Sequence, residues 1–338
     1  MTTPTQLHPR WQAWVLENLA AGASVDDVVA EVVADGVPEE VVRPEVEAIR
    51  GGVAYAVARR MHNRAAALEQ MVRLRRYYRD QFAAPIRRMP LPSAEAFREH
   101  VIAPGNPVIL TDLVPRFTAY GRWSHAFFAE HYGEVEVSAC VGRDAHRMPD
   151  ADWKELIETM PMRVFIDRIL DPGVGNDIYM IAKNRTIHET RLRDALAEVE
   201  LPPELFGDPP PHRSTGLWIG GKGTHTPLHH DGENSVLMQF VGRKRFRMIP
   251  PESVALLEAS DGVYSTWDPP ETPEDEAPDQ YQEFILEPGE ALVIPSGWWH
   301  QVVSLEPSIS LTVLDLAWPT DVQWYRPGTA LRGRITSP

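Results

Sequence analysis

The chain has one cysteine, Cys140, in 338 residues. A single thiol excludes both an internal disulfide and a zinc cluster built from several cysteines. No apolar run approaches the roughly 18 residues that a membrane helix needs. The first residues, Met-Thr-Thr-Pro-Thr-Gln, also lack the basic and then apolar segment of a secretory signal. These absences predict a protein of the reducing, cytoplasmic compartment with no membrane partner.

Basic residues are scarce except in one segment, and the formal net charge is −15. Residues 53–88 hold nine arginines against Glu69 and Asp80, whereas residues 1–52 hold three arginines against nine acidic residues. A basic helix can bind phosphate groups, but we expect the acidic segment before it to neutralise this one. The acidic remainder repels nucleic acid and favours a cationic substrate. The sequence therefore predicts no nucleic-acid partner.

Residues 1–83 read as a helical module. Ser24-Val-Asp-Asp27 is typical of a helix start, and valines follow it at helical spacing. Gly36 is a natural end for this helix, and Pro38 is a natural start for the next one. That second helix is expected to end at Gly51-Gly52. A longer helix is expected to run from there to about residue 82. The module could mediate dimerisation, dock a carrier or peptide, or brace the rest of the chain.

Residues 84–320 read mainly as short strands separated by turns, which is typical of a β-barrel. Within them, Thr226-Pro-Leu-His-His-Asp231 and Gly297-Trp-Trp-His300 stand out. Side chains alternate faces along a strand, so His229 and Asp231 project to the same side, away from His230. If His300 arrives from a neighbouring strand, the three form the 2-His-1-carboxylate ligand set of a mononuclear iron(II) site. Residues 321–338 read as a C-terminal tail.

The segments TPLHHD, QFVGRKRF and GEALVIPSGWWHQVVSL together resemble the cupin-like branch of the JmjC oxygenases, which includes the asparaginyl hydroxylase that inhibits hypoxia-inducible factor. The resemblance extends from about residue 84 to about residue 318. It implies a mainly β fold with helical additions, in which a double-stranded β-helix (jelly-roll or cupin) barrel follows the helical module. It also implies a homodimer.

The resemblance also implies roles for individual residues. His229, Asp231 and His300 would bind Fe(II), and Lys244 would pair with the distal carboxylate of the cosubstrate 2-oxoglutarate. Hydroxyl groups would help to hold the same carboxylate, from Thr226 and from Tyr179. A further group would lie near the substrate or behind the ligands: Asn234, Ser235, Trp218 and Trp298. Family members commonly have asparagine where this chain has Ser235, so the substrate is not carried over from any relative.

The activity implied is that of a dioxygenase. It would use O2 and 2-oxoglutarate to hydroxylate an unactivated C–H bond of a peptide or protein side chain, releasing succinate and CO2. A free amino acid or small metabolite is an alternative substrate, and demethylation of N-methyl-lysine relies on the same chemistry. A non-catalytic binding protein with a cupin fold is the alternative from a different class.

Overall fold

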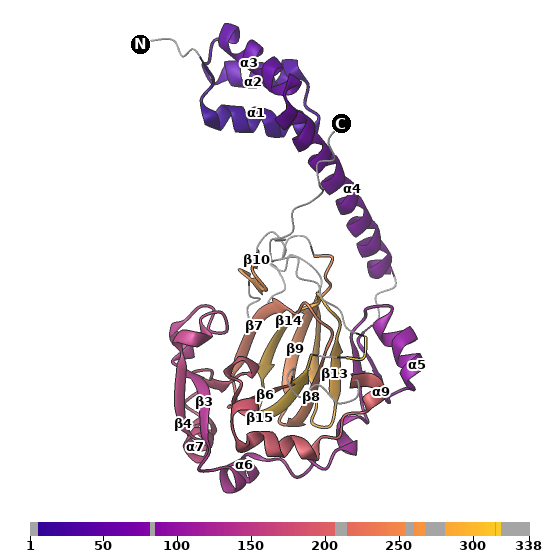
Figure 1. Ribbon diagram of the computed structural model, residues 1–338, viewed down its shortest axis with the longest axis vertical. Helices are drawn as coiled ribbons and strands as arrows, with labels where there is room; N and C mark the ends of the chain where they lie inside the picture. Colours follow the sequence, from indigo (N-terminus) through magenta and orange to yellow (C-terminus); the bar gives the residue numbers. More distant parts are fainter. Residues whose placement is uncertain are drawn as a thin grey trace, which may run out of the picture. The chain divides into compact units, whose positions relative to one another are not determined.

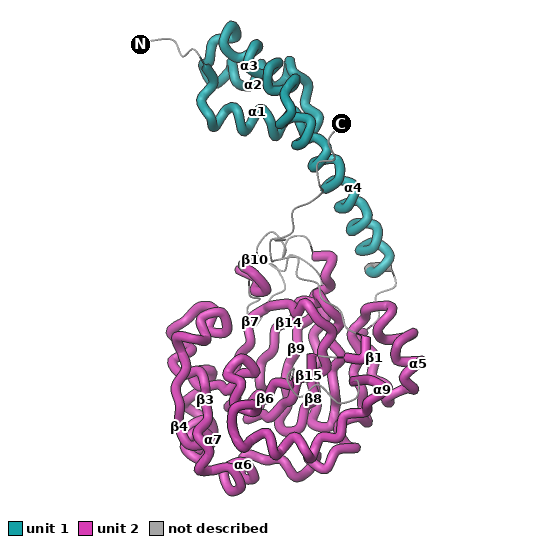
Figure 2. The backbone as a smooth tube through the Cα atoms, in the orientation of Figure 1, with its two compact units in different colours: residues 1–83 teal, residues 84–338 magenta. Residues whose placement is uncertain are grey.

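The computed structural model describes residues 6–81, 85–206, 215–253, 260–267, 281–314 and 316–318, so the predicted tail at 321–338 lies outside it. The chain divides into two compact units, residues 1–83 and residues 84–338 (Figure 2). No helix within the described ranges is long and apolar enough to cross a membrane.

The first unit consists of helices in its described part. They are α1 (Pro9–Ala21), α2 (Val25–Ala34), α3 (Glu39–Gly51) and α4 (Val53–Gln81). The predicted start of α2 is present, because the backbone N–H of Asp27 donates to the Ser24 hydroxyl at 3.1 Å. The valines at helical spacing form the core of this unit: Val28, Val29 and Val32 pack with Val15 and Leu19.

The second unit is a double-stranded β-helix with additions (Figure 1). Eight strands alternate between two sheets, apart from the step from β9 to β12. They are β6 (Thr215–Gly220), β7 (His225–His230), β8 (Ser235–Val241), β9 (Lys244–Ile249), β12 (Gln282–Leu286), β13 (Ala291–Ile294), β14 (Trp299–Ser304) and β15 (Ser308–Val313). The sheet orders are β1-β2-β13-β8-β15-β6-β5-β3-β4 and β10-β11-β7-β14-β9-β12. This topology confirms the predicted fold class.

Shorter elements extend the sheets and cover them. The additional strands are β1 (Arg87–Met89), β2 (Val108–Leu110), β3 (Glu136–Val141), β4 (Ile157–Pro161), β5 (Ile178–Met180), β10 (Ser260–Asp261) and β11 (Tyr264–Ser265). The helices are α5 (Ala94–Phe97), α6 (His125–His131), α7 (Met162–Leu170), α8 (Thr186–Glu189) and α9 (Pro203–Phe206). Short π- or 3-10 segments span Arg98–Ile102, Val114–Arg116, Arg143–Ala145, Trp153–Glu155, Ala182–Asn184 and Arg191–Glu198.

Apolar side chains from both sheets form a common core. Leu237 and Ile294 come from the nine-stranded sheet, while Phe246, Met248 and Val302 come from the six-stranded sheet. Each is at most 7% exposed. The alternation of side chains along a strand sends its other residues away from this core. Polar side chains that point to the same side as these core residues can therefore meet inside the barrel, and they form the candidate site.

Candidate metal and cosubstrate site

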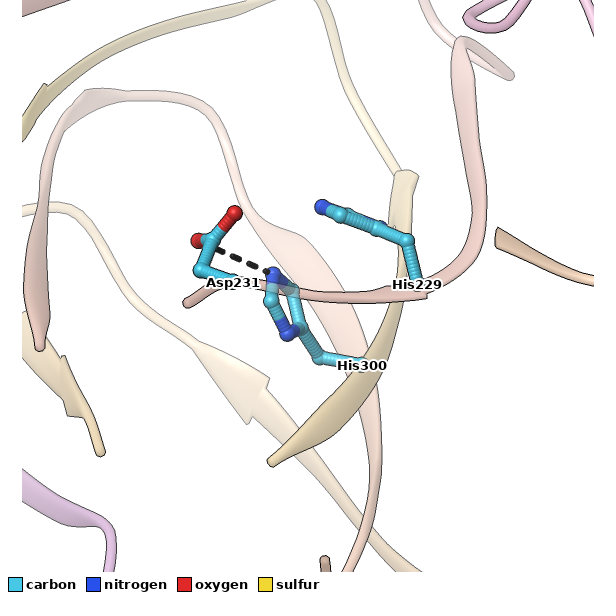
Figure 3. A group of neighbouring side chains, drawn as sticks. All are labelled: His229, Asp231 and His300. Carbon is cyan, nitrogen blue, oxygen red and sulfur yellow. Dashed lines mark ion pairs between the residues drawn. The ribbon is translucent and has the colours of Figure 1, made fainter. Parts of the chain in front are cut away.

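The structure brings the three predicted metal ligands together (Figure 3). His229 on β7 and His300 on β14 are direct partners across the antiparallel pair, with ring centroids 4.1 Å apart. Asp231 follows the end of β7, and its Oδ2 lies 3.9 Å from Nε2 of His300. One potential ligand atom from each residue lies within 4.8 Å of the others. This spacing suits a single metal ion.

Both histidines are oriented by backbone carbonyls. Nδ1 of His229 lies 2.8 Å from the carbonyl oxygen of Pro227, and Nδ1 of His300 lies 2.9 Å from that of Trp298. An N–H at Nδ1 satisfies each carbonyl and leaves Nε2 with a lone pair for a metal. Burial, reinforced by the adjacent His229, lowers the pKa of His300 to about 4. The imidazole is therefore neutral at physiological pH, as metal binding requires.

The chemistry of the donor set decides which metal fits. Two imidazoles and one carboxylate on a single face, with further coordination positions open, are the facial triad of non-haem iron(II). A structural zinc site would need four protein ligands, and among the described residues only His229, Asp231 and His300 form such a potential metal-binding group. The residues present thus fit iron(II).

A second cluster contains the residues predicted to hold the cosubstrate. Lys244, at the start of β9, is 1% exposed, and its Nζ donates to the hydroxyl of Tyr179 at 3.2 Å. Tyr179 on β5 is 2% exposed and also has a side-chain hydrogen bond with Thr226 on β7. Burial lowers the pKa of Lys244 to about 7. Burial also raises the pKa of Tyr179, so its hydroxyl stays protonated.

Lys244 has no counter-ion within the described part of the chain. A buried ammonium without a carboxylate partner is costly. It is therefore suited to an anionic ligand, and a carboxylate would both neutralise it and accept its remaining hydrogen bonds.

One pocket of about 180 Å³ contains both clusters. His229, Asp231 and His300 line it together with Lys244 and Thr226. Much of the remaining wall is apolar, formed by Ile181, Leu237, Val263, Ile294, Val302 and Leu314. A small pocket with apolar walls and a few convergent polar groups is the usual form of a cosubstrate site.

The four residues assigned to substrate or support lie in different places. Trp218 and Ser235 line the pocket, and the indole N–H of Trp218 donates to Thr312 Oγ1 at 3.0 Å. Asn234 is buried and accepts from the backbone N–H of Ser296 at 3.0 Å, four residues before His300. The side chain of Trp298 is buried in the core, and only its backbone carbonyl serves the site, through the His300 ring.

Four polar residues near the pocket were missed by the sequence analysis. Lys183 and Tyr264 line it, as does Asp150, which forms a buried ion pair with Arg143. Lys183 follows Tyr179 by four residues but lies in the 3-10 segment Ala182–Asn184 beyond the end of β5, so strand parity does not predict its direction. The other three come from separate segments, and no spacing in the sequence links them to the metal ligands.

A double-stranded β-helix with two histidines and an aspartate on adjoining strands defines a cupin-type metal barrel. The model of the cupin-like domain family matches residues 93–314. The chain belongs to this family and, with it, to the JmjC-type oxygenases that use iron(II) and 2-oxoglutarate. This confirms the resemblance drawn from the motifs.

Similar proteins include lysine-specific demethylase 8 of Xenopus tropicalis, which is 29% identical over 67% of this chain and 52% of its own length. Lysine-specific demethylase JMJ30 of Arabidopsis thaliana is 30% identical over 65% of this chain and 52% of its own. The bifunctional arginine demethylase and lysyl-hydroxylase psr-1 of Caenorhabditis elegans is 26% identical over 68% and 62%. The chain thus spans about half the length of the first two relatives.

Proposed function

We propose that this protein is an Fe(II)- and 2-oxoglutarate-dependent dioxygenase that hydroxylates an unactivated C–H bond of a peptide or protein side chain. The main observation in support is a pocket that contains the His229, Asp231 and His300 group beside Lys244, whose side chain has no counter-ion among the described residues. The first feature suits iron(II) and the second suits a carboxylate. Family membership supports the same conclusion.

The chain's own residues would bind and orient the reactants. His229, Asp231 and His300 would hold the ion and leave its other positions open. Lys244 would bind the distal carboxylate of 2-oxoglutarate, with further hydrogen bonds from the hydroxyls of Thr226 and Tyr179. When bound, iron(II) and 2-oxoglutarate supply the activation of O2, with succinate and CO2 as products.

The apolar wall would keep water away from the reaction. Leu237, Ile294 and Val302 line the pocket and are at most 7% exposed. A dry site strengthens the charge-assisted hydrogen bonds to the cosubstrate and limits side reactions. The walls thus favour productive oxidation over loss of the oxidant to solvent.

Experiments can distinguish the alternative substrates and roles. A free amino acid or small metabolite would need no peptide for turnover, whereas demethylation of N-methyl groups would release formaldehyde. The names of the relatives favour demethylation, and the psr-1 protein is also named as a lysyl-hydroxylase. A non-catalytic binding protein of this fold would bind neither iron(II) nor the keto acid.

Anaerobic titration tests the proposal directly. The metal-free protein receives iron(II) and then 2-oxoglutarate, and the weak visible charge-transfer band of the chelate is recorded. We expect the band in the wild-type protein and its loss in His229→Ala. If the band is absent in the wild type under conditions where a known oxygenase gives it, the dioxygenase proposal is wrong and the binding-protein alternative gains support.

Assembly and location are further parts of the proposal. We propose a homodimer in the cytoplasm, on the basis of the family resemblance and the single, buried Cys140. Light scattering coupled to gel filtration tests the assembly, since a mass near twice the chain's 38.1 kDa is expected. A mass of one chain at micromolar concentration would exclude the dimer.

A further inference from the structure

A second lysine, Lys183, lies on the pocket wall beside His229. Its Nζ donates to the hydroxyl of Tyr264 at 2.5 Å and to the backbone carbonyl of Asp150 at 3.0 Å. Tyr264 on β11 is the register partner of His229, and the two rings are 5.8 Å apart. Lys183 is thereby fixed next to the candidate metal group.

The hydrogen bonds around Lys183 leave one donor available. The Tyr264 hydroxyl donates its own proton to the Asp150 carbonyl at 3.0 Å, so Lys183 is the donor to Tyr264. A lysine ammonium has three N–H groups, and within the described residues two of them have acceptors. Burial lowers the pKa of Lys183 from its ordinary value, and the nearby carboxylates of Asp150 and Asp231 oppose this shift by favouring the ammonium form. The third N–H thus offers a cationic donor to a ligand in the pocket.

The nearby carboxylates are already engaged. Asp150 is 2% exposed and forms a two-pronged ion pair with Arg143, with N–O distances of 3.1 and 3.4 Å. Asp231 belongs to the proposed iron ligands. No other carboxylate lines the pocket in the described part of the chain. With Lys244 bound to the cosubstrate, a cationic side chain would therefore meet Lys183 without a free carboxylate to pair with.

We propose that Lys183 determines substrate specificity by binding a carboxylate or carboxamide oxygen of the side chain to be oxidised, and that lysine, arginine and their N-methyl forms are rejected. The inference rests on the proposed dioxygenase function and names its substrate class. It runs against the cationic substrate that the overall acidic charge favours. The charge-assisted hydrogen bond from Lys183 supplies the attraction, and like charge in a poorly solvated pocket supplies the rejection.

Matched peptide pools test this substrate class. Each pool has one fixed central residue and random flanks, and succinate release by the iron-loaded wild-type protein is measured with each. Pools fixed at asparagine, aspartate, glutamine or glutamate are expected to exceed an alanine pool several-fold. Pools fixed at lysine, arginine or trimethyl-lysine are expected to match the alanine pool. Preference for a cationic pool overturns the inference, and so does a lack of response to every pool.

Substitutions test whether Lys183 is responsible. Lys183→Met should lower kcat/KM for the preferred pool by about ten-fold, mainly through KM, because one charge-assisted hydrogen bond is lost. Lys183→Arg should retain the preference, and Lys183→Glu should shift it toward the cationic pools. The matched control is Lys222→Met, since this lysine is exposed on the turn between β6 and β7 and does not line the pocket. An unchanged pool ranking in Lys183→Met and Lys183→Glu refutes the assignment.

The inference and the proposed function fail in different ways. If the wild-type protein gives no charge-transfer band with iron(II) and 2-oxoglutarate, the dioxygenase function itself is wrong. If the band forms but the cationic pools are the best substrates, the function stands and only the role of Lys183 is wrong.

Discussion

Replacing Lys244 by methionine should change stability and cosubstrate binding in opposite directions. Burial lowers the pKa of Lys244 from 10.5 to about 7. At roughly 1.4 kcal/mol for each pKa unit, the buried charge destabilises the folded state by about 5 kcal/mol at pH 6. Methionine fills a similar volume without charge and loses only the hydrogen bond to Tyr179, worth about 1 kcal/mol. We expect the cosubstrate-free protein to gain at most about 4 kcal/mol in unfolding free energy at pH 6.

The same substitution should weaken the binding of 2-oxoglutarate. Removing one partner of a buried, hydrogen-bonded charge pair costs about 2–5 kcal/mol, which corresponds to a rise in Kd of roughly 30-fold or more. Urea unfolding of the metal-free protein measures the first effect, and anaerobic calorimetry with iron(II) present measures the second. Lys222→Met, at an exposed lysine, should change neither. Lower stability of Lys244→Met at pH 6, or a Kd within three-fold of wild type, would refute the reasoning.

Three further predictions concern the same pocket. His300→Ala should weaken iron(II) binding by at least about ten-fold and abolish the charge-transfer band, whereas His146→Ala, at a partly exposed histidine paired with Asp152, should keep it. In the cosubstrate-free wild type, the unfolding free energy should rise between about pH 7 and pH 10.5 relative to that of Lys244→Met. The reason is that the unfolded lysine keeps a proton that the folded one has lost. An equal dependence of unfolding free energy on pH in both proteins would contradict this. Arg143→Met should cost about 3–5 kcal/mol in urea unfolding because it leaves the Asp150 carboxylate buried without its cation, and adding Asp150→Asn should restore part of the loss.

The grouping of the candidate metal ligands could be predicted because strand geometry links sequence spacing to direction. His229 and Asp231 are two residues apart, and a strand places such residues on the same side whatever the rest of the fold does. The position of His300 needed more, since its register with His229 depends on the whole barrel. The motif resemblance supplied that information, and the structure brings the three residues within reach of one ion.

The helical module was predicted from local rules alone. Ser24 caps α2, and α3 ends at Gly51, next to the Gly51-Gly52 break expected from the sequence. Caps and helix breaks act within a few residues of the chain, so they can be predicted without knowledge of tertiary contacts. The functions suggested for the module stay predictions, because they depend on partners that local rules do not reveal.

The neighbours of the metal ligands could not be predicted in the same way. Tyr264 meets His229 through the pairing of β11 with β7, across 34 residues of sequence. Arg143 reaches both Asp150 and the backbone carbonyl of His225, at 2.7 Å. These contacts depend on how loops return to the barrel, and neither periodicity nor spacing encodes that. The residues proposed to select a substrate are therefore harder to predict from sequence than those proposed to hold the metal.

Two lysines in one pocket illustrate how environment divides roles between identical side chains. Lys244 is buried and has no counter-ion in the described part of the chain, so its charge is costly until a carboxylate binds. The proposed cosubstrate would supply that carboxylate in every catalytic cycle. Lys183 is held by Tyr264 and a backbone carbonyl. Burial lowers its pKa, but the carboxylates of Asp150 and Asp231 offset part of that shift, whereas Lys244 has no such support in the described part of the chain. The residue at the position of Lys183 can therefore differ between relatives that act on different substrates, while cosubstrate binding is preserved. On this argument, relatives that act on cationic side chains should retain a lysine equivalent to Lys244 and replace Lys183, and solving their pockets would test it.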